Sequence, residues 1–531
     1  MADELPVSMA GEGRLHLIVP DGMPPLAEVE VTGGWLAEVN WEKDEAKRAL
    51  LSDVHFAVDW WLWRTVTVRF IPRHDGEVAL VLNGPWGEQK PGVPLRQEIL
   101  WDEVRGSGAD VANGAFDLRD ENGPIGWNSP GQTYPKAGEW PSEAGLAASW
   151  QGRPLSQQLK VNAGREVTLV LTARAAAPPN FKEPKRLDGE TKAHRYASRL
   201  KRGMNLGNGW EAPLEGWGIR FEAADVDRIA DEGFDHIRVP VAWHHRMKDG
   251  VISPEFISEF EPVVKRALER KLRVIVNWHH FDDLIHDPEA HRERFVKHWE
   301  VIAKYFAGWP EELCLELYNE PRAPLEGELL NEIHADVIGA IRRIQPERTL
   351  MVNPAMWANV KKLSQLRLPD DEDNVIVSVH SYEPFEFTHQ GASWVQLNEL
   401  KGVTFPGPPA EPLRLPDELK ERLGEWTEKY NTLKGEANPV SPQVIENALD
   451  IAAAWAERFG RPVHVGEFGA YQAGDRASRE TYTRAVREGC EKRGIPWCLW
   501  EWKSGFGYWD SRENRPRLRE ALFQDSLSTG S

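Results

Sequence analysis

Two glutamates lie where a carboxylate could do chemistry. Glu320 is in the tripeptide Asn-Glu-Pro directly after the apolar run LCLELY, and Glu467 follows the apolar run PVHV and Gly466. Asn-Glu-Pro alone is a weak signal, because Asn and Pro favour turns whatever the function. A carboxylate at the end of an apolar strand is a stronger signal, because burying it without a role is costly. We therefore expect these two side chains to act together.

Other polar side chains follow similar apolar runs. They are Asn208 and Glu211 after GMNLG, Arg238 within HIRVPV, His279 and His280 after RVIVNW, Asn319 beside Glu320, His380 and Tyr382 around the end of VIVSVH, and Trp500 in IPWCLWEW. Charged groups in such places are paired or functional. Arg238 and Tyr382 are candidates to hold Glu467 ionised by hydrogen bonding, which leaves the pKa of Glu320 to be raised by the like charge opposite it.

The elements that must position these residues alternate along the second part of the chain. Eight apolar runs, typical of buried strands, are separated by helical patterns: GMNLG, HIRVPV, RVIVNW, LCLELYN, TLMVNP, VIVSVH, PVHVGEF and IPWCLWEW. One helix is expected to begin at Ser441 and Pro442 and to end at Gly460, and another to begin at Ser253 and Pro254. This alternation predicts a C-terminal (β/α)8 TIM barrel, whose active site lies at the C-terminal ends of the strands.

In a closed barrel the fourth and seventh strands face each other across the mouth, so Glu320 and Glu467 can meet there. Retaining glycosidases hold two carboxyl groups about 5 to 5.5 Å apart, one as general acid/base and one as nucleophile. The acid must stay protonated while its partner stays ionised, so their surroundings must differ. The sequence therefore predicts a double displacement at a glycosidic bond, carried by these two side chains.

Seven segments together resemble the motifs of a known family. GMNLGNGWEAP, HIRVP, NWHH, ELYNEP, HSYEPFEFTHQGASW, HVGEFG and PWCLWEW are similar, in order and spacing, to those of family 5 glycoside hydrolases of clan A, the cellulase and mannanase family. The resemblance covers about residues 195 to 525 and implies Glu320 as general acid/base and Glu467 as nucleophile. It also implies a sugar site completed by Arg238, His279, Asn319, His380, Tyr382 and Trp500, with Asn208, Glu211, His280 and Trp394 contacting further sugar units.

The resemblance implies an enzyme of the cellulase or endoglucanase type that hydrolyses β-1,4-glucan with water as second substrate. A β-mannanase or a mixed glucan and mannan hydrolase is the alternative within the family. From another class, the alternative is a polysaccharide-binding protein that no longer cleaves, and the presence of both glutamates argues against it. The irregular region from about 384 to 440, including an apparent insertion after Trp394, leaves endo and exo action both open.

The N-terminal part, residues 1–180, has a different rhythm. Short runs such as RTVTVRFI, EVALVLNG and REVTLVLTA alternate apolar and polar residues between Gly, Asn and Pro. This pattern predicts an antiparallel β-sandwich, which resembles a carbohydrate-binding accessory module. Ten tryptophans fall in its first 150 residues, and we expect most to be core and some to form a sugar-stacking platform. Residues 181–192 are expected to be a linker, and 193–531 the catalytic barrel.

Composition excludes several partners. Asp and Glu number 83 against 64 Lys and Arg, and the net charge of −19 disfavours nucleic acid and acidic membranes. No apolar run approaches the roughly 20 residues that span a bilayer. Three cysteines are too few for a disulfide framework, so free thiols are expected. We expect a monomer that is extracellular or periplasmic, with its signal peptide outside this sequence, and an intracellular protein is the alternative.

A metal cluster is the main rival chemistry. His279, His280, Asp282 and Asp283 have metal-ligating side chains. Neighbouring residues of a strand point to opposite faces, so the two histidines are poorly placed to share one ion. The sequence also lacks G-x-S-x-G, H-E-x-x-H, C-x-x-C and a phosphate-binding glycine loop. We expect neither a metal nor an organic cofactor.

Overall fold

The computed structural model describes residues 10–18, 27–32, 35–40, 50–90, 92–120, 123–128, 145–177 and 183–523. The chain divides into two compact units, Met1–Lys182 and Glu183–Ser531. The division falls inside the segment in which the sequence predicts a linker.

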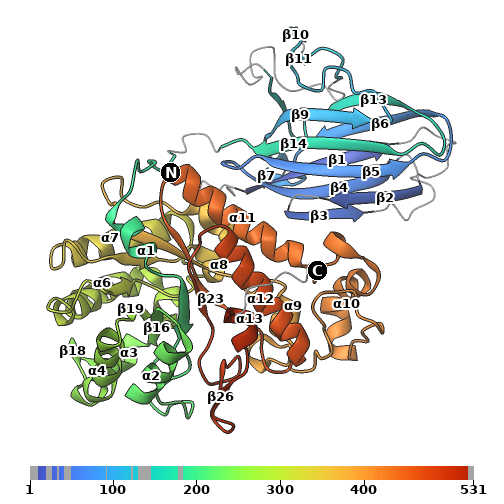
Figure 1. The fold of residues 1–531 in the computed structure, drawn as a ribbon. Coiled ribbons are helices and arrows are strands. Elements are labelled where there is room, and N and C mark those ends of the chain that lie inside the picture. The colour runs from blue at the N-terminus through green and yellow to red at the C-terminus, as the bar shows by residue number, and fades with distance from the viewer. Residues whose placement is uncertain are drawn as a thin grey trace. The chain divides into compact units, whose positions relative to one another are not determined.

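The N-terminal unit contains two antiparallel sheets of five strands each (Figure 1). The first sheet has the order β13 (Leu155–Val161), β6 (Gly76–Asn83), β1 (Ala10–Ile18), β4 (Leu50–Asp59) and β3 (Trp35–Asn40). The second has the order β12 (Ala147–Ser149), β9 (Ile99–Ser107), β14 (Val167–Ala175), β5 (Arg64–Ile71) and β2 (Ala27–Thr32). The short hairpins β7 (Glu88–Lys90) with β8 (Val93–Pro94), and β10 (Arg119–Asp120) with β11 (Gly123–Pro124), lie outside these sheets. The all-β prediction is confirmed.

Alternating side chains explain why these segments pair as strands with one buried face. Every second residue of β14 is buried, including Leu169 and Leu171, and β4 buries Val54, Phe56 and Val58 in the same way. Strands β1 and β4 of the first sheet contact β14 of the second, so the apolar faces of the two sheets meet. The runs singled out in the sequence do not include β3 or β4, although LLSDVHFAVD alternates as clearly as the others.

Most of the tryptophans in this unit whose side chains are described are buried. These are Trp60, Trp61, Trp101, Trp127 and Trp150. Trp63 and Trp86 are exposed instead. Trp41 and Trp140 lie outside the described residues, as does the side chain of Trp35. The core role expected for most of these residues therefore holds for five of the seven described side chains.

The C-terminal unit is a closed barrel of eight parallel strands, as predicted (Figure 1). In order they are β15 (Arg202–Asn205), β16 (His236–Val241), β19 (Arg273–Trp278), β20 (Leu313–Glu316), β21 (Leu350–Val352), β22 (Val375–His380), β23 (Val463–Phe468) and β24 (Trp497–Leu499). Every residue of β16, β22 and β23 is buried, which explains why they read as continuous apolar runs rather than alternating ones.

Helices follow most of these strands. The longer ones are α2 (Ala223–Glu232), α4 (Pro254–Glu269), α6 (Pro288–Tyr305), α7 (Gly327–Arg342), α11 (Pro442–Phe459) and α12 (Arg476–Lys492). The shorter ones are α3 (Trp243–Arg246), α5 (Asp282–His286), α8 (Ala355–Ala358), η2 (Val360–Gln365) and α13 (Arg519–Phe523). Two predicted ends are confirmed: Ser253 caps α4 by accepting from the N–H of Phe256 at 3.2 Å, and Gly460 ends α11 with φ of 60°.

A short helix closes the floor of the barrel. α1 (Lys192–Ala197) places Ala193 and Tyr196 in one apolar cluster with residues from four strands, namely Ile275, Cys314, Met351 and Ile376. Within the predicted linker, Leu187 donates its N–H to the carbonyl of Phe459 at 3.0 Å. The described part of that linker is therefore packed on the barrel unit. Cys314, Cys490 and Cys498 are buried free thiols, as predicted.

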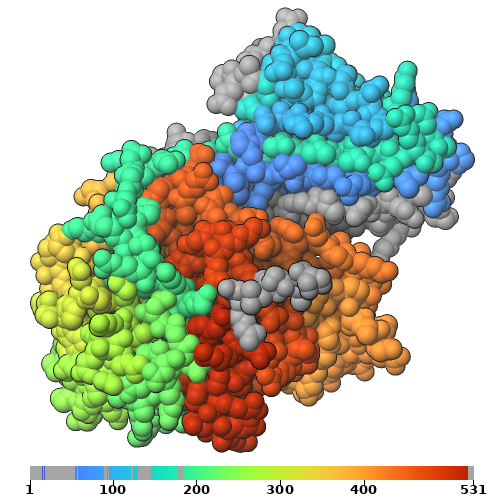
Figure 2. Space-filling view, viewed as in Figure 1, coloured from blue at the N-terminus to red at the C-terminus, as the bar shows by residue number. Residues whose placement is uncertain are grey.

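The long segment between β22 and β23 is folded. It contains α9 (Phe385–Thr388), η3 (Ser393–Val395), α10 (Asp417–Thr432) and η4 (Gly435–Ala437). The buried amide of Gln390 bonds both the carbonyl and the N–H of Val403, at 2.7 and 3.1 Å. The N–H of Phe405 donates to Ser478 Oγ of α12 at 2.9 Å, and in Figure 2 the orange surface of this segment adjoins the red C-terminal helices. Among the described residues, no helix is both long and apolar enough to span a bilayer.

Candidate active site

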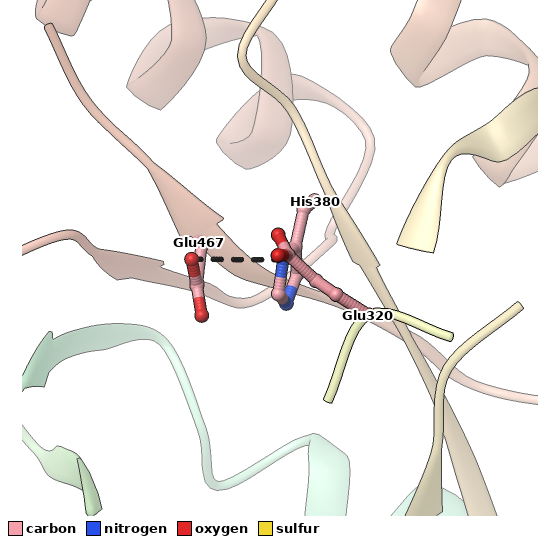
Figure 3. A group of neighbouring side chains, drawn as sticks. All are labelled: Glu320, His380 and Glu467. Atoms are coloured by element: carbon pink, nitrogen blue, oxygen red, sulfur yellow. Dashed lines mark hydrogen bonds and ion pairs between the residues drawn. The ribbon is translucent and has the colours of Figure 1, made fainter. Parts of the chain in front are cut away.

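The two glutamates meet at the C-terminal end of the barrel. Glu320 follows β20, Glu467 lies in β23, and His380 ends β22. Nδ1 of His380 is 2.7 Å from Oε1 of Glu320 and 3.6 Å from Oε2 of Glu467. Figure 3 shows the three side chains pointing toward one another, and a carboxylate oxygen of Glu320 lies within 4.8 Å of one of Glu467. The pair predicted from sequence is therefore brought together.

The backbone of Glu320 has a left-handed conformation, with φ of 52°. Such a conformation is costly for a residue with a side chain and is found mostly where the surroundings enforce it, often at functional sites. Here the N–H of Glu320 donates to Oδ1 of the buried Asn353 at 3.1 Å. Asn353 thus holds the turn that aims Glu320 into the barrel mouth.

Arg238, on β16, lies at the centre of the polar interior and is fully buried. It donates to both oxygens of Glu316, at 2.6 and 3.1 Å, and to Oε1 of Glu467 at 2.7 Å. It also donates to the amide oxygens of Asn205 and Asn319. Burial alone would lower the pKa of Arg238, but Glu316 and Glu467 outweigh it and raise that pKa. A permanent positive charge therefore lies under the pair formed by Glu320 and Glu467.

Glu467 is held from two sides. Arg238 donates to Oε1, and the hydroxyl of Tyr382 donates to Oε2 at 2.9 Å. Burial raises the pKa of Glu467, while His380 and Arg238 act against that rise. Because both carboxylate oxygens accept hydrogen bonds, one of them from a cation, this is the carboxyl group of the pair best suited to stay ionised.

Glu320 accepts no bond from a cation in the same way. Burial is the largest cause that raises its pKa, and His280, Arg238 and Arg322 oppose the rise from farther away. The expectation that the carboxylate opposite is the main cause is therefore corrected. Desolvation dominates because the Glu320 side chain is only 15 % exposed. The two carboxyl groups nevertheless differ as an acid and a nucleophile must.

Three more predicted residues line the same mouth. The ring of His279 stacks on Trp500 at 5.5 Å with an interplanar angle of 7°. Asn319 donates its N–H to the carbonyl of Trp278 at 2.9 Å, and its amide lies 3.4 Å from Nε2 of His279. Burial holds the pKa of His279 well below its usual range, so the ring is neutral. Neutral polar groups beside an aromatic face suit a sugar.

Of the four residues predicted to contact further sugars, Asn208, Glu211 and His280 lie on loops and Trp394 lies in η3. Both oxygens of Glu211 accept backbone N–H groups, from Asn208 and Gly209, and burial raises the pKa of Glu211 to about 8. His280 lies next to His279. Burial lowers the pKa of His280, and the nearby charge of Glu320 opposes that shift. Trp394 is 58 % exposed and packs edge-on against Tyr471.

Sequence reasoning missed a lower layer of polar residues. Glu316 and Asn353 hydrogen-bond each other at 2.9 Å, and Asn205 donates to the carbonyls of Gly466 and Leu499 at 2.9 and 3.2 Å. Each is a polar residue inside an apolar run, which was the available signal. Glu501 was also missed; it accepts the N–H groups of residues 503, 504 and 506, and burial raises its pKa to about 7.

The proposed rival metal cluster does not form. Asp282 pairs with Arg322 at 2.8 Å and Asp283 with Arg294 at 2.7 Å. Within the described ranges, the one group of three or more ligating side chains close enough for an ion is Glu320, His380 and Glu467. Their atoms are the ones that already bond to each other, to Arg238 and to Tyr382.

A parallel barrel with two carboxyl groups this close across its mouth has the geometry that a glycoside hydrolase needs. A family model described as "Cellulase (glycosyl hydrolase family 5)" matches residues 200–505, more than half of the chain. The chain therefore belongs to the cellulase family, glycosyl hydrolase family 5.

Curated relatives and solved structures agree with this assignment. Endoglucanase H of Acetivibrio thermocellus is 27% identical over 307 residues, 57% of this chain and 29% of its own length. Endoglucanase 3 of Fibrobacter succinogenes is 27% identical over 63% of this chain and 53% of its own length. The chain thus spans between 29% and 53% of the length of these two relatives. The crystal structure of endoglucanase Cel5A of Thermotoga maritima is 32% identical with a TM-score of 0.54, and covers 62% of this chain and 98% of its own.

Proposed function

We propose that this protein is a retaining hydrolase of β-1,4-linked glucan that uses Glu320 as general acid/base and Glu467 as nucleophile. The observation that carries the proposal is the carboxyl pair itself: oxygens within 4.8 Å of each other, with only Glu467 bonded to a guanidinium. That spacing suits direct attack on the sugar and leaves no room for a water between the carboxyl groups, as an inverting enzyme needs.

In the first step Glu467 attacks the anomeric carbon and the bond from that carbon to the glycosidic oxygen breaks. Glu320 gives its proton to the departing oxygen, which leaves as the hydroxyl of the released chain. Arg238 and Tyr382 hold Glu467 ionised and aimed until it attacks. The products of this step are a glycosyl ester on Glu467 and an ionised Glu320.

In the second step a water molecule gives a proton to Glu320 and attacks the anomeric carbon from the face that the leaving group vacated. The ester bond to Glu467 breaks and its carboxylate is restored. Glu320 again carries its proton, so the cycle can repeat. Two inversions leave the anomeric configuration of the product unchanged.

Two kinds of observation bear on the substrate. The relatives reported above are named endoglucanases, and Cel5A of Thermotoga maritima has been solved in complex with cellobiose and with mannotriose. The stacked Trp500 and His279 offer an apolar face with neutral polar edges, which suits any neutral pyranose. We propose glucan as the main substrate, and a mixed glucan and mannan hydrolase as the second candidate.

The test is release of reducing ends from carboxymethylcellulose, barley β-glucan, glucomannan and pure mannan. Glu467→Ala is expected to lower kcat on the order of 10⁴-fold or more. Glu320→Ala is expected to lose about 10²- to 10⁴-fold, and to lose less with an aryl glycoside whose leaving group needs no proton. A polysaccharide-binding protein without activity would release nothing from any of the four, and wild type and variants would then behave alike.

The anomer formed with azide separates the two roles. With an activated aryl cellobioside, Glu320→Ala plus azide should give the β-glycosyl azide, because azide opens the ester on Glu467. Glu467→Ala plus azide should give the α-glycosyl azide, because azide then attacks the substrate directly. The opposite pairing of variant and product would contradict the assignment of the two glutamates.

We also propose that the N-terminal unit binds polysaccharide through Trp86, whose side chain is 56 % exposed. The backbone beside it is fixed, because Gln151 donates to the carbonyl of Gly87 at 2.6 Å and accepts its N–H at 3.2 Å. A fixed, exposed indole can stack on a sugar ring. Trp86→Ala should weaken binding to insoluble cellulose and leave turnover of soluble glucan unchanged. The control is Val93→Ala in the adjoining β7–β8 hairpin, which should change neither binding nor turnover.

A further inference from the structure

A third buried glutamate lies close to the two that are proposed to act on the sugar. Glu316 is the last residue of β20 and is fully buried. The mechanism proposed above gives this side chain no chemical step. Its hydrogen bonds nevertheless lead to both Glu320 and Glu467, each through one intermediate side chain.

The first route runs to Glu467 through Arg238. Arg238 donates from Nε to Oε2 of Glu316 at 2.6 Å and from Nη2 to Oε1 of Glu316 at 3.1 Å. Its remaining terminal nitrogen, Nη1, donates to Oε1 of Glu467 at 2.7 Å. A guanidinium group is planar and rigid, so two bonds along one edge fix the direction of the third nitrogen. Glu316 therefore aims Nη1 of Arg238 at Glu467.

The second route runs to Glu320 through Asn353. The amide nitrogen of Asn353 donates to Oε1 of Glu316 at 2.9 Å and to the carbonyl of Ser378 at 3.1 Å. The amide oxygen of Asn353 accepts the N–H of Glu320 at 3.1 Å. The reversed amide would place its oxygen against two oxygens and its nitrogen against an N–H, so only this orientation can bond. Glu316 therefore holds Asn353, which holds the left-handed turn at Glu320.

The direction of each of these bonds is fixed without assigning a proton. Each donor is an N–H of Arg238, of the Asn353 amide or of the backbone, and each acceptor is an oxygen. A guanidinium has donors only and keeps its charge at every pH that a folded protein meets. Because both oxygens of Glu316 face N–H groups of Arg238, Glu316 is the carboxylate partner of that cation.

The charge of Glu316 also acts on the pair. Burial is the largest cause that raises the pKa of Glu320, while Arg238 acts to lower that pKa and Glu316 acts to raise it. Burial raises the pKa of Glu467 as well, and Arg238 acts against that rise. Glu316 thus offsets part of the guanidinium charge at the centre of the barrel. The other charged or titratable groups around the pair are Glu211, His279, His280, Arg322, His380, Tyr382 and Cys498.

We propose that Glu316 is a positioning residue for both glutamates: it fixes Arg238 against Glu467 and Asn353 against the backbone of Glu320, and so sets how the two carboxyl groups face each other. Glu316 acts only through these two neighbours. This inference rests on the proposed function, because it takes Glu467 as nucleophile and Glu320 as general acid/base.

Two reactions separate the two routes. Glucan hydrolysis needs both glutamates, whereas release of dinitrophenolate from 2,4-dinitrophenyl 2-deoxy-2-fluoro-β-cellobioside, as it labels Glu467, needs the nucleophile but no acid. Glu316→Gln should slow both reactions on the order of 10²-fold, since a displacement of about 1 Å costs that much. Asn353→Ala breaks only the second route and should slow glucan hydrolysis alone. A loss in Glu316→Gln that is confined to one of the two reactions would overturn the proposal.

The pH profile of kcat/KM distinguishes positioning from a general loss of packing. Without the charge of Glu316, Arg238 stabilises the ionised forms of Glu467 and Glu320 more strongly, so both pKa values fall. The acid limb, which reports Glu467, and the basic limb, which reports Glu320, should both move to lower pH by about one unit in Glu316→Gln. Limbs that stay at the wild-type positions would make Glu316 a packing residue and leave the proposed function standing.

Glu316→Asp separates charge from reach. The shorter side chain keeps the negative charge but cannot meet Arg238 and Asn353 with the same geometry. It should slow both reactions while its limbs stay closer to those of wild type. Wild-type rates in Glu316→Asp would contradict the proposal, and this variant carries the test if Glu316→Gln does not fold.

Glu372→Gln is the matched control. Glu372 accepts from Nε and Nη2 of Arg342 at 2.7 and 2.9 Å, and from the N–H of Asn374 at 2.9 Å, with its side chain 8 % exposed. It is therefore a buried carboxylate paired with an arginine in the same way, at the opposite end of β22 from His380. Glu372→Gln should match wild type in both reactions and in its pH profile. Losses equal to those of Glu316→Gln would mean that breaking any buried ion pair has this effect.

A further measurement does not depend on activity. Carboxyl resonances of protein labelled with ¹³C-glutamate, assigned with Glu320→Gln and Glu467→Gln, report the two pKa values directly. Both values should be lower in Glu316→Gln than in wild type, and unchanged in Glu372→Gln. Equal values in Glu316→Gln and wild type would refute the proposal. If wild type hydrolyses neither glucan nor mannan, the proposed function fails by itself, and these resonances still decide whether Glu316 acts on the pair.

Discussion

The interiors of the two units are both buried but are built from different chemistry. Between the sheets of the N-terminal unit, β5 and β14 meet the core with Val66, Val68, Leu169 and Leu171. The upper interior of the barrel instead centres on Arg238, with carboxylates and amides around it. Apolar burial stabilises with few geometric demands, whereas each buried charge must find a partner. The barrel therefore buries costly polar groups at its centre, which is where we propose that the chemistry takes place.

The largest expected effect comes from removing the charge at that centre. Arg238→Met leaves Glu316 and Glu467 buried without their cation, and should lower the free energy of unfolding of the barrel unit by about 3–5 kcal/mol while abolishing hydrolysis. Arg487→Met is the control, because its partners Glu488 and Glu491 are 40% and 32% exposed. Denaturant titration followed by tryptophan fluorescence measures the free energy of unfolding of both variants. Equal losses in Arg238→Met and Arg487→Met would contradict the idea that the central charge costs more to remove.

In the sandwich the same depth of burial is tested with an apolar side chain. Leu80 is fully buried on β6, between β1 and β13. Leu80→Ala should cost about 2–5 kcal/mol in the unfolding of the N-terminal unit, and leave kcat on soluble glucan unchanged. Leu118→Ala, which removes a side chain that is 60% exposed, should change stability by less than about 0.5 kcal/mol. Calorimetry on the full chain separates the two transitions.

The same contrast explains what the sequence could and could not predict. Alternating or continuous apolar runs predict strands, because the pattern of buried side chains in a strand is visible in that strand's own sequence. Glu320 and Glu467 were predictable because they end such runs in a fold whose strand ends converge. Glu316 was not, since LCLEL shows one polar residue but not that Arg238 and Asn353, far away in sequence, would pair with it.

Long-range pairing also limits the prediction of the segment between β22 and β23. Its order depends on contacts such as Gln390 with Val403 and Phe405 with Ser478. Sequence patterns give the helix near ELKERLGEWTEKY, which is α10, but not the partners that fix the loops around it. The sequence predicted that the pKa of Glu320 is raised, but not that burial is the largest cause. Burial of Glu320 depends on the closed barrel and not on its neighbours in sequence.

Tyr382→Phe weakens the polar interior without removing a charge. The hydroxyl stabilises the ionised form of Glu467, so its loss should raise the pKa of Glu467 and move the acid limb of the kcat/KM profile to higher pH. A hydrogen bond to a charged group contributes about 1.5–3 kcal/mol, which is one to two pH units at most. Tyr305→Phe removes a similar bond to Glu261 outside the site and should not move the limb.

Glu211 gives the most specific test, because it is a buried carboxyl group of the barrel unit bonded to backbone N–H groups rather than to a cation. Burial raises its pKa to about 8 from a usual value of 4.5, so the folded protein binds this proton more tightly than the unfolded chain. Stability is therefore fully present below about pH 4.5 and falls as pH rises toward 8, by at most about 1.4 kcal/mol per pH unit.

Glu211→Gln lacks this titration, so its free energy of unfolding should fall less between pH 5 and pH 8 than that of wild type, and the two curves should run parallel above pH 8. Glu501, whose pKa burial raises to about 7, contributes equally to both proteins and cancels in the difference. Equal slopes below pH 8 would mean that the N–H groups of Asn208 and Gly209 outweigh burial and keep Glu211 ionised. Its role would then be that of a charged acceptor rather than a neutral acid in the cleft.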